Sequence, residues 1–132
     1  MAAGIEGETS AARKVLIAED DANIVESLSF VLGRAGFEVG TALDGDEVLR
    51  RLRVEAFDVL VLDLMLPKRN GFEVLKAIKA EPALRALPVL VLTAKGQPQD
   101  RRLVESIGAE AFMTKPFSNT DLVDAVRRLV RS

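Results

Sequence analysis

Acidic side chains follow two apolar runs of this chain and are the residues best suited to chemistry. Glu19, Asp20 and Asp21 come directly after the run 15–18, and Asp63 ends the run 59–62. Ligands of open α/β sheets bind beyond the carboxyl ends of the strands, so these acids are expected at one rim. Carboxylates that share a pocket repel one another unless a hard cation lies between them, and Mg²⁺ is the usual cation. The spacing therefore predicts an acidic, magnesium-binding pocket.

Two later apolar runs also end in polar residues. The run 88–92 leads into Thr93, and the run 110–114 leads into Lys115. Together with the acids, these residues suit phosphoryl transfer. A metal and a lysine neutralise phosphoryl oxygens, a hydroxyl donates to one of them, and a carboxylate can act as the nucleophile.

The elements that must position these residues alternate along the chain. Apolar runs predict strands at 14–18, 37–42, 57–62, 88–92 and 110–114, with 37–42 as an edge strand. Amphipathic stretches predict helices at 22–35, 45–53, 71–80 and 98–107, and a last helix that begins with the capping sequence 118–121. The result is a (βα)5, doubly wound parallel sheet in the order 2-1-3-4-5. Its switch point lies between the two strands that end in Asp20 and Asp63.

Length and composition limit the function further. The chain has 132 residues, of which 13–132 are expected to form one domain; the polar and aperiodic segment before it, 1–12, is expected to be a disordered tail. A net charge of −2 gives no signature of nucleic-acid binding, and no apolar stretch or signal peptide indicates a membrane or export, so a cytoplasmic location is expected. Because the chain has no cysteine and no histidine, metal binding must use carboxylate, hydroxyl, lysine or backbone groups.

Four motifs at the strand ends carry a family resemblance. They are AEDD at 18–21, LDLMLP at 62–67, LTA at 92–94 and KPF at 115–117. With these four motifs in this order, the chain resembles the receiver domains of two-component response regulators over residues 14–131. These are flavodoxin-like modules that histidine kinases phosphorylate on an aspartate.

The resemblance implies a role for each residue of the pocket. Asp63 is the phosphoacceptor, and Asp20 is a direct Mg²⁺ ligand together with Asp63. Glu19 binds the metal through water or a hydrogen bond, and Met65 contributes its backbone carbonyl. A helix cap is the structural alternative for Asp21.

The remaining roles concern the phosphoryl group and the conformational switch. Thr93 and Lys115 contact phosphoryl oxygens, and the peptide bond before Pro116 is cis. Phe112 occupies an aromatic switch position where tyrosine is frequent, so a switch residue and a plain core residue both stay open. Thr93 and Lys115 each also have a purely structural alternative. Thr93 would be an ordinary strand residue, and Lys115 a solvated loop residue.

The partners implied are a sensor histidine kinase or phosphotransfer protein, and a downstream effector protein or output domain. No direct nucleic-acid or membrane contact is expected. Three origins remain open: a stand-alone receiver, a receiver from a longer regulator, and a receiver from a hybrid kinase. A homodimer through the fourth helix, fifth strand and fifth helix also remains open under the resemblance. Ala111 and Ala125 stand where DNA-binding regulators that dimerise in this way carry an acid and an arginine. This weakens the DNA-binding alternative.

The resemblance favours a phosphorylation switch over a turnover enzyme, with self-catalysed phosphoryl transfer and dephosphorylation only. A Mg²⁺-dependent aspartyl-phosphate phosphohydrolase is one alternative, but it needs a general acid where this chain has Met65. A degenerate receiver that only docks partners is another, and the intact set of site residues argues against it.

Lys68 and Arg69 make the loop after Asp63 basic. A solvated loop is favoured there over a surface that steers an acidic kinase.

Overall fold

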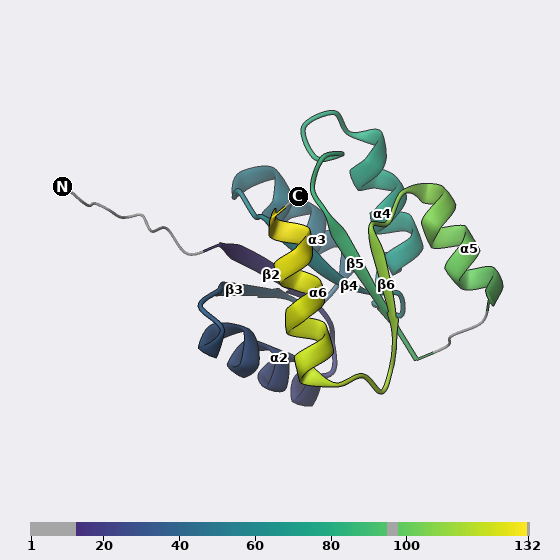
Figure 1. Ribbon diagram of the computed structural model, residues 1–132. Helices are drawn as coiled ribbons and strands as arrows, with labels where there is room; N and C mark the ends of the chain where they lie inside the picture. Colours follow the sequence, from purple (N-terminus) through teal and green to yellow (C-terminus); the bar gives the residue numbers. More distant parts are fainter. Residues whose placement is uncertain (1–12, 95–97, 132) are drawn as a thin grey trace.

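Five parallel strands, each followed by a helix, form the framework of the protein (Figure 1). The computed structural model describes residues 13–94 and 98–131. The strands are β2 (Lys14–Ala18), β3 (Glu38–Ala42), β4 (Val59–Asp63), β5 (Val89–Thr93) and β6 (Ala111–Thr114). The helices are α2 (Ala22–Arg34), α3 (Gly45–Val54), α4 (Gly71–Ala80), α5 (Pro98–Ile107) and α6 (Asn119–Arg131).

The sheet has the order β3-β2-β4-β5-β6, and all four pairings are parallel. In chain order this is 2-1-3-4-5, so the predicted flavodoxin-like fold is confirmed. The stretch predicted as an edge strand is β3, at one side of the sheet. The switch point lies between β2 and β4, as predicted, and the polar residues that end these strands therefore meet there.

Helices cover both faces of the sheet because its central strands are apolar on both sides. Every residue of β4 and β5 is buried. Leu60 and Leu62 join the cluster under α3, α4 and α5, whereas Val59 and Val61 join the cluster under α2 and α6. Figure 1 shows α6 and α2 on one side of the sheet, with α4 and α5 side by side on the other.

Polar side chains fix where the helices begin. Asp21 accepts hydrogen bonds from the N–H groups of Asn23 and Ile24 and caps α2, as expected for a structural role. Asn70 and Glu73 form a reciprocal capping box at the start of α4. At α6, the N–H of Asp121 donates to Ser118 Oγ, within the predicted capping sequence.

Residues 1–12 lie outside the described part of the chain, so the disordered tail stays a prediction. Within the described ranges, none of the helices is long and apolar enough to cross a membrane.

Candidate functional site

Three carboxylates meet at the switch point of the sheet. Glu19 and Asp20 follow β2, and Asp63 is the last residue of β4. A backbone hydrogen bond from Glu19 N to Ala42 O continues the pairing of β2 with β3 and holds Glu19 in place. The three side chains each offer an oxygen within 4.8 Å of the others. The acids that the sequence predicts at one rim therefore do form a cluster in the structure.

Burial divides the three acids into two kinds. Glu19 and Asp63 are only 1% and 3% exposed, whereas Asp20 is exposed. Two unit charges at this separation repel by about 3 kcal/mol at an effective dielectric constant of about 20. Such a cluster needs positive charge nearby, and the exposed Asp20 keeps one side of it open to solvent.

Lys115 supplies part of that positive charge. Its Nζ lies 2.8 Å from Glu19 Oε1 and 3.5 Å from Asp63 Oδ2. The backbone N–H of Lys115 donates to the carbonyl of Thr93 at 2.8 Å, which holds the loop after β6 against the end of β5. The lysine side chain is mostly buried, so it is not the solvated loop residue of the structural alternative.

These contacts shift the pKa of two groups. Burial raises the pKa of the Glu19 carboxyl above its ordinary 4.5, and the charge of Asp63 acts in the same direction, although the hydrogen bond from Lys115 opposes both. Burial lowers the pKa of Lys115, but the hydrogen bond to Glu19 and the charge of Asp63 outweigh it, so this pKa lies above 10.5. Lys115 is therefore a cation at neutral pH. This one ammonium contacts Glu19 and Asp63, two of the three acids in the cluster.

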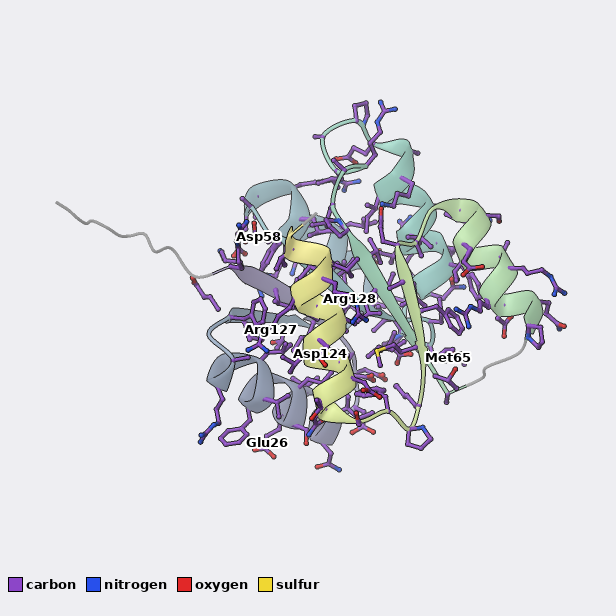
Figure 2. All side chains as sticks on the ribbon, viewed as in Figure 1. Glu26, Asp58, Met65, Asp124, Arg127 and Arg128 are labelled. Carbon is purple, nitrogen blue, oxygen red and sulfur yellow. The ribbon has the colours of Figure 1, made fainter. Side chains whose placement is uncertain are left out.

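The Asp63 carboxylate has a fixed orientation. Its Oδ1 accepts a hydrogen bond from the backbone N–H of Met65 at 3.1 Å, while its Oδ2 faces Lys115. The side chain of Met65 is 59% exposed, so it forms part of the mouth of the site rather than its floor. Figure 2 shows Asp58 at the start of β4 and Met65 just beyond its end. The site lies at the end marked by Met65.

The remaining predicted residues lie on β5, on β6 and in the loop that follows β6. Thr93, the last residue of β5, is 1% exposed and pairs with Thr114 across the sheet. Phe112 on β6 is half-buried against the core, and the guanidinium carbon of Arg101 lies 5.7 Å from its ring centroid. The Lys115–Pro116 peptide bond is cis. The pocket thus brings together Glu19, Asp20, Asp63 and Lys115, with Thr93 on the adjoining strand end.

The basic part of the loop after Asp63 is exposed, as the favoured solvated alternative predicts, and its charged side chains are also paired. Lys68 and Arg69 form ion pairs with Asp44 and Asp46 at the start of α3. Sequence analysis missed Gly45, which packs directly on the backbone of Arg69. The only signal was a glycine between two acids at a helix start, where many residue types would serve.

The sequence model of the response regulator receiver domain matches residues 15–127. The chain therefore belongs to this family, and it is a receiver domain of the two-component response regulators.

Similar proteins agree with this assignment. The chain is 40% identical, over 90% of its length, to the alkaline phosphatase synthesis transcriptional regulatory protein PhoP of Bacillus subtilis, and covers 49% of it. It is 38% identical, over 91% of its length, to the phosphate regulon transcriptional regulatory protein PhoB of Escherichia coli, and covers 52% of it. The chain thus spans about half the length of these curated relatives.

Solved structures show the same fold. The chemotaxis response regulator CheY4 of Vibrio cholerae is 33% identical and superposes with a TM-score of 0.85 over 90% of this chain and 99% of that one. The receiver domain of the Francisella response regulator 1452 is 29% identical, with a TM-score of 0.86 over 90% and 97% of the two chains.

Proposed function

We propose that this receiver accepts a phosphoryl group on Asp63, in the presence of Mg²⁺, and changes conformation to control an effector protein or output domain. The donor is the phosphohistidine of a sensor kinase or phosphotransfer protein. The observation that carries the proposal is the buried carboxylate of Asp63, which has two further carboxylates within 4.8 Å and an ammonium at 3.5 Å.

The oxygen atoms around Asp63 fit a magnesium ion. Carboxylate and carbonyl oxygens are the ligands that this hard cation prefers, and the cluster carries more negative than positive charge. Asp20, Asp63 and the carbonyl of Met65 would hold the ion, with Glu19 bound through water or a hydrogen bond. When bound, Mg²⁺ supplies positive charge that offsets the repulsion between the nucleophile and the phosphoryl oxygens.

The residues of the chain orient the reacting groups. An oxygen of the Asp63 carboxylate attacks phosphorus, the P–O bond forms, and the P–N bond to the donor imidazole breaks, with its electron pair leaving on nitrogen. The Met65 N–H and Lys115 already hold both carboxylate oxygens in place. Holding the nucleophile in one geometry lowers the entropy cost of the reaction.

The acyl phosphate would then reorganise the pocket. It adds roughly 1.5 to 2 negative charges, by analogy with other phosphorylated side chains. Lys115 would pair with a phosphoryl oxygen, and the hydroxyl of Thr93 would donate to another. Because a ligand shifts a conformational equilibrium only through contacts that differ between the two states, these contacts must favour the active conformation. Phe112, half-buried on the strand next to β5, is the residue proposed to report the shift.

The proposal describes a switch and not a turnover enzyme. The receiver catalyses its own phosphorylation and dephosphorylation, and its output is a protein contact. PhoP and PhoB are named as transcriptional regulators, so control of a DNA-binding output domain is one form that this output would take. The receiver itself, with a net charge of −2, is proposed to make no direct nucleic-acid contact.

The test is the intact mass of the protein after incubation with Mg²⁺ and acetyl phosphate. A gain of one phosphoryl group, about 80 Da, is expected in the wild type and should disappear with Asp63→Asn or with a chelator. Asp58→Asn is the matched control, because Asp58 lies near the other end of β4 (Figure 2) and should leave the adduct intact. Absence of an adduct together with absence of beryllofluoride binding would overturn the proposal.

A further inference from the structure

The loop between β4 and α4, residues 64–70, is attached to the start of α3 at three points. Arg69 Nε donates to Asp46 Oδ1 at 3.1 Å. Lys68 Nζ lies 3.7 Å from Asp44 Oδ2. Between these two ion pairs, the backbone N–H of Gly45 donates to the carbonyl of Pro67 at 3.3 Å. We call these three contacts the loop clamp.

Gly45, which makes the central contact of the loop clamp, also packs so closely on Arg69 that no side chain would fit there. A Cβ atom at Gly45 would lie 2.0 Å from the carbonyl oxygen of Arg69 and 2.7 Å from its Cβ. Real Cβ atoms do not approach other atoms so closely, and a carbonyl oxygen of the backbone cannot rotate away as a side chain can. Any residue other than glycine would therefore push the loop away from α3.

The backbone of the loop is also held in an uncommon conformation. Lys68 has φ of +66°, and among the non-glycine residues that the structure describes it alone has a positive φ. Such a conformation is strained for a residue with a side chain and persists only where the surroundings enforce it. Here the N–H of Arg69 donates to the carbonyl of Pro67 at 2.8 Å, which closes a γ-turn centred on Lys68, and Arg69 packs against Gly45 of α3.

The loop clamp acts on the segment that carries the candidate metal ligands. The loop follows Asp63 directly, and its first residue, Leu64, is hydrogen-bonded through its N–H to Leu92 O and through its carbonyl to the N–H of Gly71. Met65 follows, with its N–H bonded to Asp63 Oδ1. The segment is thus fixed to the sheet on one side of Met65 and to α3 on the other.

We propose that the loop clamp positions the backbone of Met65 and thereby sets the affinity of the site for Mg²⁺. This inference rests on the proposed function, because it takes the Met65 carbonyl and Asp63 as ligands of the ion. Gly45, Lys68 and Arg69 are positioning residues, since none of them belongs to the set of ligands proposed for the ion. The two ion pairs are exposed, and exposed pairs contribute little singly, so the Gly45 contact should be the largest part.

The decisive experiment compares two glycine-to-alanine variants of the full chain by titration calorimetry with Mg²⁺. Gly33→Ala is the matched control, because it also lies in a helix and a Cβ there would meet nothing within 4 Å. The control should bind Mg²⁺ as the wild type does. Gly45→Ala should bind at least about tenfold more weakly, which corresponds to about 1.4 kcal/mol. Its circular dichroism spectrum and cooperative unfolding should show that it is folded.

A charge variant separates positioning from simple electrostatics. Arg69→Glu adds negative charge near the site, so an effect of charge alone would strengthen Mg²⁺ binding. If the loop clamp positions Met65, Arg69→Glu should instead weaken Mg²⁺ binding by about threefold, as expected for loss of one exposed ion pair. The double variant Asp46→Arg, Arg69→Glu restores an ion pair of opposite direction and should recover most of the affinity.

The outcomes distinguish this proposal from the proposed function. Absence of Mg²⁺ binding in the wild type would overturn both. Equal affinity of wild type, Gly45→Ala and Gly33→Ala, with all three folded, would overturn the loop clamp alone. If Gly45→Ala does not fold, the charge variants decide: stronger binding by Arg69→Glu, or no recovery in the double variant, would overturn the loop clamp.

Discussion

Lys115 Nζ hydrogen-bonds to Glu19 at 2.8 Å and lies farther, 3.5 Å, from Asp63. The two bonded residues are separated by 96 positions in the sequence, and Glu19 is almost fully buried. The ammonium therefore neutralises a neighbour of the proposed phosphoacceptor more directly than the phosphoacceptor itself. A phosphoryl group on Asp63 would compete with Glu19 for this ammonium.

Replacement of Lys115 by methionine tests this relationship. Lys115→Met keeps the apolar stem and removes the charge, so the buried Glu19 loses its cation and the free energy of unfolding without Mg²⁺ should fall by about 2 to 4 kcal/mol. Mg²⁺ affinity, measured by titration calorimetry, should rise several-fold because the ammonium no longer offsets the carboxylates. Lys76→Met, at an exposed position of α4, is the control and should change neither quantity. Weaker Mg²⁺ binding by Lys115→Met would contradict this prediction.

Thr93 should couple the phosphoryl group to the rest of the domain. Thr93→Val preserves the shape of this buried side chain at the end of β5 and removes its hydroxyl. We expect acetyl phosphate still to modify Asp63, because the carboxylate and Lys115 are intact. The change in the ring resonances of Phe112 on addition of beryllofluoride, followed by NMR, should be largely lost. An unchanged response of Phe112 would show that the hydroxyl is not part of the switch.

The start of α4 depends on its capping box. Asn70 Oδ1 accepts from the N–H of Glu73 at 3.0 Å, and Glu73 Oε1 accepts from the N–H of Asn70 at 3.3 Å. Asn70→Ala should lower the free energy of unfolding by about 1 kcal/mol, measured by urea denaturation. Asn70→Asp retains an acceptor at this position and should cost much less. Equal losses in the two variants would mean that the cap does not stabilise the helix.

An ion pair far from the site predicts how stability depends on pH. Arg51 donates from Nε and from a terminal nitrogen to the two carboxylate oxygens of Glu55, at 2.8 and 3.0 Å. These hydrogen bonds lower the pKa of Glu55 from its ordinary 4.5. The pKa of Glu55 is lower in the folded chain than in the unfolded chain. The pair therefore stabilises the fold fully at pH values above 4.5, and this contribution is lost as the pH falls through the pKa of the folded state.

The variant Glu55→Gln makes that dependence measurable. The urea midpoints of wild type and Glu55→Gln should differ by a constant amount from neutral pH down to about 4.5, and the difference should shrink at lower pH. Arg51→Gln removes the donor instead and should follow the same course. A difference that stays constant down to acid unfolding would show that Glu55 does not contribute through its charge.

Most elements of the fold were predictable because each depends on local sequence. The strand 14–18 and the helices 71–80 and 98–107 have the predicted bounds. Asp63 and Thr93 were predicted just after their strands, but they are the last strand residues, since Asp63 pairs with Leu92 and Thr93 with Thr114. The parallel ladder extends over these polar residues because their backbone groups find partners in the neighbouring strand, which an apolar pattern does not reveal.

The contacts of the loop after Asp63 were not predictable. Arg69 and Asp46 are 23 residues apart, and their ion pair depends on how α3 packs beside the loop. The same holds for Lys115 and Glu19, whose direct bond depends on the whole sheet. Local patterns predicted that these charged residues occur at strand ends and loops. Which of them pair was determined by packing over long distances in the sequence.

Arg13, Leu129 and Val130 line one cavity of about 410 Å³, together with Asp58 at the other end of β4 from Asp63. The first described residues and the end of α6 thus lie at the rim of the sheet opposite the acidic pocket. A fluorescent label attached beside Arg13 or Val130 would stand clear of the pocket and of any donor that reaches it. A fluorescent label at this rim would allow the receiver to be tracked, and attachment to a surface there would immobilise it, while the acidic cluster at the other rim stays accessible.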